Sequence, residues 1–209
     1  MYQHETKSRA GFDAGHVSIP KNTFETLLGT VSAPYEFTLE QNQLSKTFDV
    51  LVLCTGNSAR SILGEMLFKH LGQGRINAYS AGSKPGGQVN PVALETLARH
   101  GVPCIGARSK SWDEFNADAV PPAPKLNFIF TVCGNAAEEI CPVWPGHPAT
   151  SHWGIPDPAH IEPMEARRAA FEDAYQALKQ RIEAFLALPL ETMTTQEVTL
   201  AARRIHTGV

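Results

Sequence analysis

The chain has 209 residues, of which 43% are hydrophobic and 19% are charged. These values, with 16 Gly and 15 Pro, are typical of a globular protein and exclude a collagen-like, coiled-coil or wholly disordered chain. At about 150 residues per domain, the length favours one domain with additional terminal segments. The formal net charge is −3, which argues against long-range electrostatic attachment to nucleic acid or to an anionic membrane.

The first 46 residues are polar and irregular, and only one helix of about two turns is expected there, from the candidate N-cap Asn22 to Gly29. It is too short to fold alone, so we expect residues 1–46 to form an N-terminal extension. The chain start has no apolar stretch typical of a signal peptide, and no apolar run approaches the roughly 18 residues that span a bilayer. A cytoplasmic protein with no membrane span is therefore expected.

From residue 48 onward, predicted strands and helices alternate. Short β-branched or aromatic runs indicate strands, and apolar residues three and four apart indicate helices. The predicted strands are Phe48–Leu53, Arg75–Ala81, Leu126–Val132 and Thr150–Ile155, and the predicted helices are Ser58–Gly72, Pro91–His100 and Pro163–Leu188. This alternation predicts an α/β domain over residues 47–188 with an open, mostly parallel sheet. Residues 189–209 are expected to form a C-terminal helical tail, with Thr194 and Glu197 spaced as a capping box.

The loop after the first predicted strand carries the clearest chemical signal. Cys54 and Arg60 flank five residues at the point where a helix begins, with Ser61 next. Backbone amides at a helix N-terminus bind an oxyanion, and the same field favours a cysteine thiolate. The planar Arg60 fork suits two oxygens of a tetrahedral ion. The predicted oxyanion-binding residues are Thr55, Gly56, Asn57, Ser58, Ala59, Arg60 and Ser61. A buried cysteine beside a surface arginine is the alternative.

This Cys-x5-Arg-Ser loop resembles that of the low-molecular-weight protein tyrosine phosphatase superfamily, and the resemblance extends over about residues 47–188. Residues 50–58, 79–82 and 152–159 are most similar to the arsenate reductase branch. The resemblance implies a four-stranded parallel sheet flanked by helices. Some reductases bind a monovalent cation near the loop, and Asn57, Glu65 and Ser80 match part of that pattern. Ala59 stands where many family members carry another cysteine.

A phosphatase-like loop also needs an acid that protonates the leaving oxygen, and a carboxyl group in a rigid loop after a strand suits this role. Asp157, followed by Pro158, is the candidate general acid. Ala159 stands where tyrosine phosphatases of the family place an aromatic wall, which favours a small oxyanion substrate. We expect His152 and Trp153 to have packing or supporting roles.

Two further cysteines distinguish the candidate activities. Cys133 follows a predicted buried strand whose end lies on the same side as Cys54, and Cys141 comes eight residues later. Cys133 can attack an oxidised adduct on Cys54, and Cys141 can then attack Cys133. The resemblance implies such a relay, with thioredoxin or glutathione with glutaredoxin as electron donor. Two unconnected buried cysteines are the alternative. A zinc site with His147 and His152 is disfavoured because short Cys-x2-Cys pairs are lacking.

The leading hypothesis is therefore reduction of arsenate to arsenite, with Cys54, Arg60, Asp157, Cys133 and Cys141 as catalytic residues and no metal or cofactor. The second is hydrolysis of aryl phosphates by a tyrosine phosphatase, which needs only the first three residues. The third is a non-catalytic regulatory module that binds arsenate or phosphate. No nucleic acid or membrane partner is expected, and the sequence leaves a homodimer open.

Overall fold

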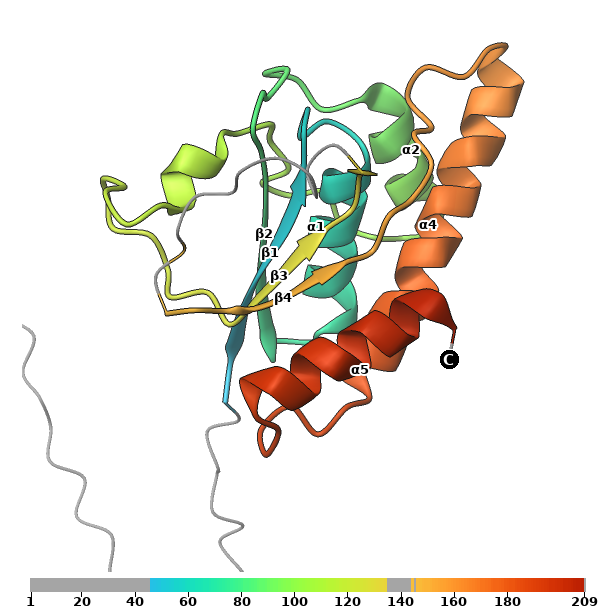
Figure 1. Cartoon of the computed structure of the whole chain (residues 1–209). Coiled ribbons are helices and arrows are strands. Elements are labelled where there is room, and N and C mark those ends of the chain that lie inside the picture. Colours follow the sequence, from blue (N-terminus) through green and yellow to red (C-terminus); the bar gives the residue numbers. More distant parts are fainter. Residues whose placement is uncertain (1–45, 135–143, 145, 209) are drawn as a thin grey trace, which may run out of the picture. The chain divides into compact units, whose positions relative to one another are not determined.

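The computed structural model describes residues 46–134, 144 and 146–208 (Figure 1). These residues form an α/β fold around a four-stranded, all-parallel sheet, which confirms the predicted fold class. The strands lie in the order β2-β1-β3-β4, with bounds β1 Phe48–Cys54, β2 Ile76–Gly82, β3 Phe128–Thr131 and β4 Ala149–His152. The helices are α1 Arg60–Leu71, α2 Pro91–Arg99, the 3₁₀ helix η1 Trp112–Phe115, α4 Met164–Leu186 and α5 Thr195–Thr207. The helix expected at Asn22 lies outside the described residues.

The register of the sheet brings the ends of its strands together. Cys54 at the end of β1 pairs with Gly82 at the end of β2, and Leu53 pairs with Thr131 at the end of β3. Thr131 in turn pairs with His152, the last residue of β4. Because all four strands are parallel, the loops that follow them all start at the same end of the sheet, where the strands have their carboxyl ends. This is where open α/β sheets bind their ligands.

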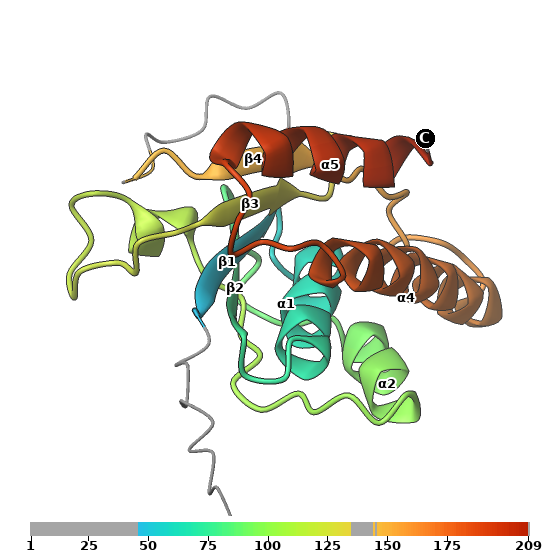
Figure 2. The same cartoon turned by 90° about the horizontal axis from the view of Figure 1, so that it is seen from below.

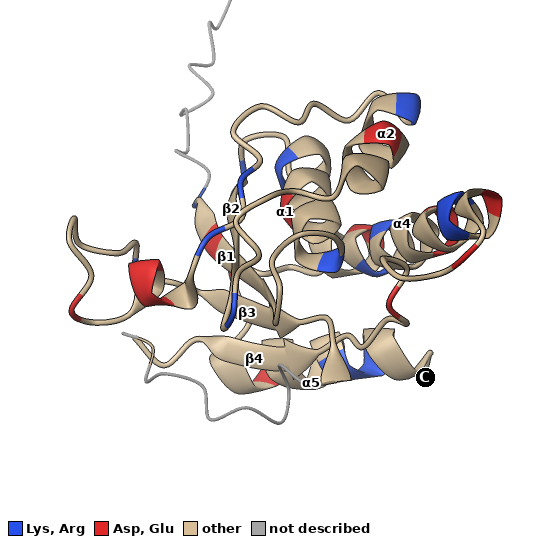
Figure 3. Cartoon of the chain, turned by 90° about the horizontal axis from the view of Figure 1, so that it is seen from above, with Lys and Arg blue, Asp and Glu red and all other residues tan. Residues whose placement is uncertain are grey.

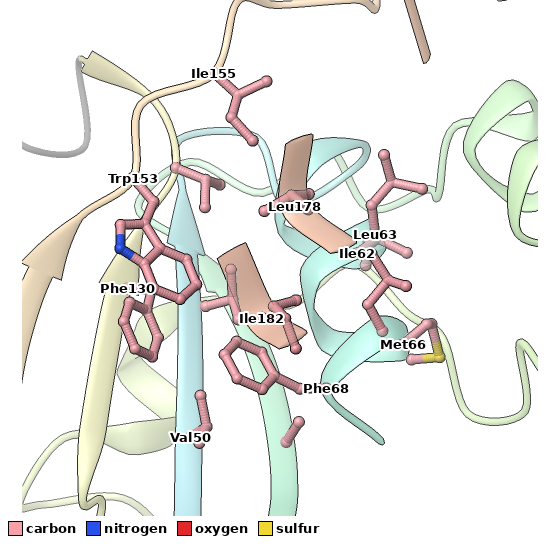
Figure 4. Close-up of a cluster of buried hydrophobic side chains, with 14 of the residues drawn as sticks. Val50, Ile62, Leu63, Met66, Phe68, Phe130, Trp153, Ile155, Leu178 and Ile182 are labelled. Atoms are coloured by element: carbon pink, nitrogen blue, oxygen red, sulfur yellow. The ribbon is translucent and has the colours of Figure 1, made fainter. Parts of the chain in front are cut away.

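One face of the sheet is packed against α1 and α4 through a cluster of buried hydrophobic side chains, aromatic rings among them (Figure 4). The rings of Phe130 and Trp153 stack with centroids 4.0 Å apart, and Phe185 meets Phe130 edge-on at 5.0 Å. Burial of each such side chain contributes about 1.5–3 kcal/mol. Helix α1 approaches β1 closely at Gly64. A Cβ at this position would lie only 2.9 Å from Cγ1 of Val52, so a larger residue would push the helix away. The core therefore fixes the start of α1 relative to β1.

The opposite face of the sheet is covered by the segment between α2 and β3. Figure 2 shows η1 and α1 on opposite sides of the sheet. The buried cluster on this face consists of Leu51, Leu53, Ala81, Phe115, Leu126, Ile129 and Trp144. A backbone bridge between Gly82 and Ser111 joins the approach to η1 to the end of β2. The sequence analysis did not predict η1.

The last helix, α5, packs on β4. Val198 and Ala202 are buried in the same core cluster as α1 and α4, and the indole Nε1 of Trp153 donates to the carbonyl oxygen of Ala202 at 2.8 Å. The predicted capping box of Thr194 and Glu197 is present at the start of the helix. The packing role expected of Trp153 is confirmed by its burial.

Charged residues of both signs occur along α4, the 23-residue helix that covers the sheet (Figure 3). Within the described part of the chain, no helix combines the length and the apolar character needed to cross a membrane.

Candidate active site

The loop of residues 54–61, here called the Cys54 loop, lines a cavity of about 400 Å³. Cys54 ends β1 and Arg60 begins α1. Between them, Asn57 has a φ of 42°, in the left-handed region that asparagine tolerates. The cavity is lined by Cys54, Thr55, Gly56, Ser58, Ala59, Arg60, Cys133, Gly134, Asp157, Ala159 and His160. Of the predicted oxyanion-binding residues, Asn57 and Ser61 are not in the lining and are fully buried.

The carbonyl oxygens of the Cys54 loop are held by the loops that surround it. Those of Thr55, Gly56 and Ser58 accept hydrogen bonds from the backbone N–H groups of Lys84, Gly86 and Asn90, at 3.0, 3.0 and 2.8 Å. Ala59 is the N-cap of α1, and its methyl group cannot satisfy the first amides of the helix. Backbone donors at this helix start therefore remain suited to an anion in the cavity.

The sulfur of Cys54 is buried among hydrogen-bonding groups. Its Sγ lies 2.9 Å from Oγ of Ser61 and accepts the backbone N–H of Asn57 at 3.2 Å. Burial raises the pKa of the Cys54 thiol, and the bonds from Ser61 and Asn57 act against this increase. Burial thus opposes the predicted thiolate, whereas the positive end of a helix such as α1 favours one.

Arg60 connects the Cys54 loop to residues 155–160, here called the Asp157 loop. Its Nη1 donates to the carbonyl oxygen of Ile155 at 3.0 Å, and its Nη2 donates to Oδ2 of Asp157 at 2.7 Å. The Asp157 side chain is 44% exposed, against 14% for Arg60. The other carboxylate oxygen, Oδ1, accepts the backbone N–H of Ala159 at 3.0 Å. Asp157, the candidate acid, therefore lies at the rim of the cavity and is held there by Arg60.

Cys133 follows β3 and lines the same cavity as Cys54. It is only 4% exposed, and its sulfur lies 3.6 Å from Oγ1 of Thr55. Beyond the larger effect of burial, Cys133 also acts to raise the pKa of Cys54. The structure thus brings together the first two members of the predicted relay. Cys141, the third, lies outside the described residues.

A network of buried polar side chains lies behind the Cys54 loop. Nδ2 of Asn57 donates to Oγ of Ser61 at 2.9 Å and to Oγ of Ser80 at 2.8 Å, and Ser80 donates to Oε2 of Glu65 at 2.5 Å. The ammonium group of Lys110 lies 3.1 Å from the same carboxylate oxygen. Asn57, Glu65 and Ser80 therefore share their network with a buried lysine, and the monovalent cation suggested for them stays a prediction.

Three residues of this region have no individual role that was predicted from the sequence. A Cβ at Gly82 would lie 2.3 Å from the carbonyl oxygen of Thr55, so glycine is required where β2 passes the loop. Its position directly after a predicted strand was the available signal. Lys110 is only 6% exposed although it stands between two serines, and no local pattern indicates its burial. His160 lines the cavity three residues after Asp157.

Among the residues described, no group of three or more His, Cys, Asp and Glu side chains is arranged to hold a metal ion.

Comparison with known proteins identifies relatives of this chain. The low molecular weight phosphotyrosine protein phosphatase family matches residues 49–198. Two curated relatives named arsenate reductase, from Shouchella clausii and Bacillus licheniformis, are 34% and 36% identical over 137 and 138 residues. Each match covers 65% of this chain and 93% of the relative.

Solved structures show the same fold. An arsenate reductase in the phosphate binding state is 25% identical with a TM-score of 0.54, over 68% of this chain and 98% of that protein. The tyrosine phosphatase Wzb from Escherichia coli K30, in complex with sulphate, is 23% identical with a TM-score of 0.53, over 67% and 96%. The second likeness supports the fold alone.

Proposed function

Because the chain belongs to the low molecular weight phosphotyrosine protein phosphatase family, we propose that it is an arsenate reductase with Cys54 as its nucleophile. The observation that carries this proposal is the presence of Cys133 in the same cavity as Cys54. Hydrolysis of a phosphate ester returns the first cysteine unchanged and needs no second thiol, whereas reduction of an oxyanion does. The relatives named arsenate reductase support the same activity.

Arsenate binding is proposed to rest on the amides of the Cys54 loop and on the guanidinium group of Arg60. The Nη2 of Arg60 is paired with Asp157 in the structure. An oxyanion in the cavity competes for this donor and so releases the carboxyl group, which can then take a proton. Asp157 would deliver that proton to the oxygen that leaves arsenic as Cys54 attacks. Thiol and arsenate thus form a sulfur–arsenic bond and release one water molecule.

The proposed relay then moves two electrons from thiols to arsenic. Cys133 attacks the sulfur of Cys54, the sulfur–arsenic bond breaks, and its electron pair stays on arsenic, which leaves as arsenite. A disulfide now joins Cys54 and Cys133. Cys141 attacks Cys133 and releases Cys54 as a thiol, so that the oxidation is carried by the second pair. An external dithiol such as thioredoxin, or glutathione with glutaredoxin, restores both thiols.

The test of this proposal is arsenite production measured with each reductant system, beside hydrolysis of an aryl phosphate. We expect sustained arsenite production with the thioredoxin system, because a disulfide between two protein cysteines is the form that a dithiol reductant accepts. Cys133→Ser should stop multiple turnover while leaving aryl phosphate hydrolysis nearly unchanged. Cys104→Ser is the matched control, because Cys104 is partly buried away from the cavity lining, and it should leave both activities unchanged.

A tyrosine phosphatase is the second candidate function, since Cys54, Arg60 and Asp157 suffice for it and all three line the cavity. Ala159 lines the same cavity, where a bulky aromatic substrate would find no aromatic wall at that position. If the protein forms no arsenite with either reductant system but hydrolyses aryl phosphates well, the phosphatase assignment replaces the reductase one.

A further inference from the structure

We propose that the ammonium group of Lys110 is a resident cation that positions the sulfur of Cys54 through a buried chain of hydrogen bonds. The inference rests on the proposed role of Cys54 as the nucleophile. Lys110 touches neither the cavity nor a reacting atom, so it is a positioning residue.

The geometry around Lys110 is that of a built cation site. Its Nζ lies 3.1 Å from Oε2 of Glu65, 3.4 Å from Oγ of Ser80 and 3.2 Å from the carbonyl oxygen of Arg108. These three acceptors match the three N–H donors of an ammonium group. The side chains of Lys110 and Glu65 are 4% and 3% exposed, so their charges are screened little by solvent. Removing either charge would therefore leave the other without its buried ionic partner, which is destabilising.

The main chain of Lys110 sets the orientation of the hydrogen bonds. Its backbone N–H donates to Oδ1 of Asn57 at 2.7 Å, so the amide nitrogen of Asn57 must face the other way. That nitrogen donates to both Ser61 and Ser80. The Ser61 hydroxyl, having accepted from Asn57, keeps its own hydrogen for the sulfur of Cys54, 2.9 Å away. The Ser61 hydroxyl can thereby donate to a Cys54 thiolate, and a hydrogen bond to the charged form of a group stabilises that form.

The ammonium group of Lys110 joins this chain at Ser80, whose Oγ accepts from Nζ of Lys110 and from Nδ2 of Asn57. Glu65 carries a negative charge close to the network, and removing the buried ammonium group would leave that charge to act on Ser80 and the groups beyond it. Burial lowers the pKa of Lys110, but Glu65 acts against this decrease. The other charged groups that influence Lys110 are the cations Arg108 and Lys69. Cys54 shares its cavity with the charged or titratable side chains of Arg60, Cys133, Asp157 and His160.

Lys69 offers a matched control for Lys110. It pairs with the same carboxylate through Oε1 of Glu65 at 2.7 Å, but its side chain is 40% exposed. An exposed ion pair contributes little, because water replaces it. Lys69→Met and Lys110→Met therefore each remove one positive charge that is paired with Glu65. The first removes it at the surface and the second in the interior.

The experiment follows alkylation of Cys54 by iodoacetamide against pH, with the modified peptide identified by mass spectrometry. Lys110→Met should slow alkylation at neutral pH about tenfold and move its pH profile upward by about one unit, while Lys69→Met should resemble the parent protein. Lys110→Ala should show the same loss and recover part of the rate with ammonium chloride. Tetramethylammonium chloride, too large for the site, should not restore it at equal ionic strength.

An unchanged profile in folded Lys110→Met would overturn the proposal, as would equal shifts in Lys69→Met or equal action of the two ammonium salts. If Lys110→Met does not fold, Lys110→Ala refolded in ammonium chloride and in tetramethylammonium chloride decides. A profile close to that of the parent protein in the first salt alone is expected, and equal profiles in the two salts would overturn the proposal. Alkylation requires no arsenate. A shifted profile in a protein that forms no arsenite would therefore reject the proposed function and leave this inference standing.

Discussion

The Cys54 loop and the Asp157 loop meet at one cavity but are held in opposite ways. The first is fixed from within the protein, because Asn57 and Ser61 are fully buried and bond to a network behind the loop. The second is fixed from the cavity side, by the ion pair of Asp157 with Arg60 at the exposed rim. The proposed nucleophile is thus held by the interior, whereas we propose that the candidate acid exchanges its partner when an oxyanion enters.

The largest effect is expected from Cys54→Ser, which should abolish both arsenate reduction and aryl phosphate hydrolysis. A serine hydroxyl is not ionised near neutral pH, so the interior cannot make it a nucleophile. Circular dichroism should report an unchanged fold, since the two side chains are similar in size. Activity retained by this variant would remove Cys54 from the mechanism.

Asp157→Asn should slow turnover by about 10²–10⁴-fold, the usual range for loss of a general acid. Oxyanion affinity should change less, because Arg60 and the loop amides remain. Pre-steady-state kinetics separates the two quantities. A turnover rate equal to that of the parent protein would show that the rim supplies no acid.

Ser61→Ala should move the pH profile of Cys54 alkylation upward. Its hydrogen bond lowers the pKa of Cys54, and removing it leaves the increase caused by burial less opposed. The thiolate fraction at neutral pH then falls, and the lost rate should return as the pH is raised. A loss of about tenfold at neutral pH corresponds to one pKa unit. A rate that stays low at every pH would indicate distortion of the loop instead.

The smallest effect is expected from His160→Ala. His160 lines the cavity but is exposed at the rim, and surface substitutions usually change stability by less than about 0.5 kcal/mol. Turnover and thermal stability should both stay close to those of the parent protein. A large loss of turnover would assign the rim a second functional group and weaken the contrast between the two loops.

The same contrast explains what could be predicted from the sequence. The Cys54 loop carries its signals locally, in a buried strand, a Cys-x5-Arg-Ser spacing and a helix start. The structure places Cys54 at the end of β1 and Arg60 at the start of α1, with Asn57 and Ser61 buried outside the cavity lining. Lys110 could not be found in this way, because it contacts Glu65 and Ser80 at 45 and 30 residues' distance along the chain. Its burial follows from packing between segments, which no local pattern contains.

The helices and strands also differ in how strongly the local sequence indicates them. The seven predicted strands and helices over residues 48–188 are present, because apolar spacing marks the helices and β-branched or aromatic runs mark the strands. The strands β3 and β4 have four residues each and are shorter than predicted. The four-residue η1 has too few residues to show helical spacing. The pairing of β1 with β3, which brings Cys133 to the cavity, depends on contacts between distant residues. The division at residues 46 and 188 and the role of Cys141 stay predictions.

The most direct test of the proposed reductase is a single turnover with arsenate in Cys141→Ser, followed by peptide mass spectrometry under non-reducing conditions. We expect one equivalent of arsenite and a disulfide between Cys54 and Cys133, since the thiol that would resolve this disulfide is gone. Arsenite released without that disulfide, or with Cys54 joined to a small external thiol, would contradict the relay.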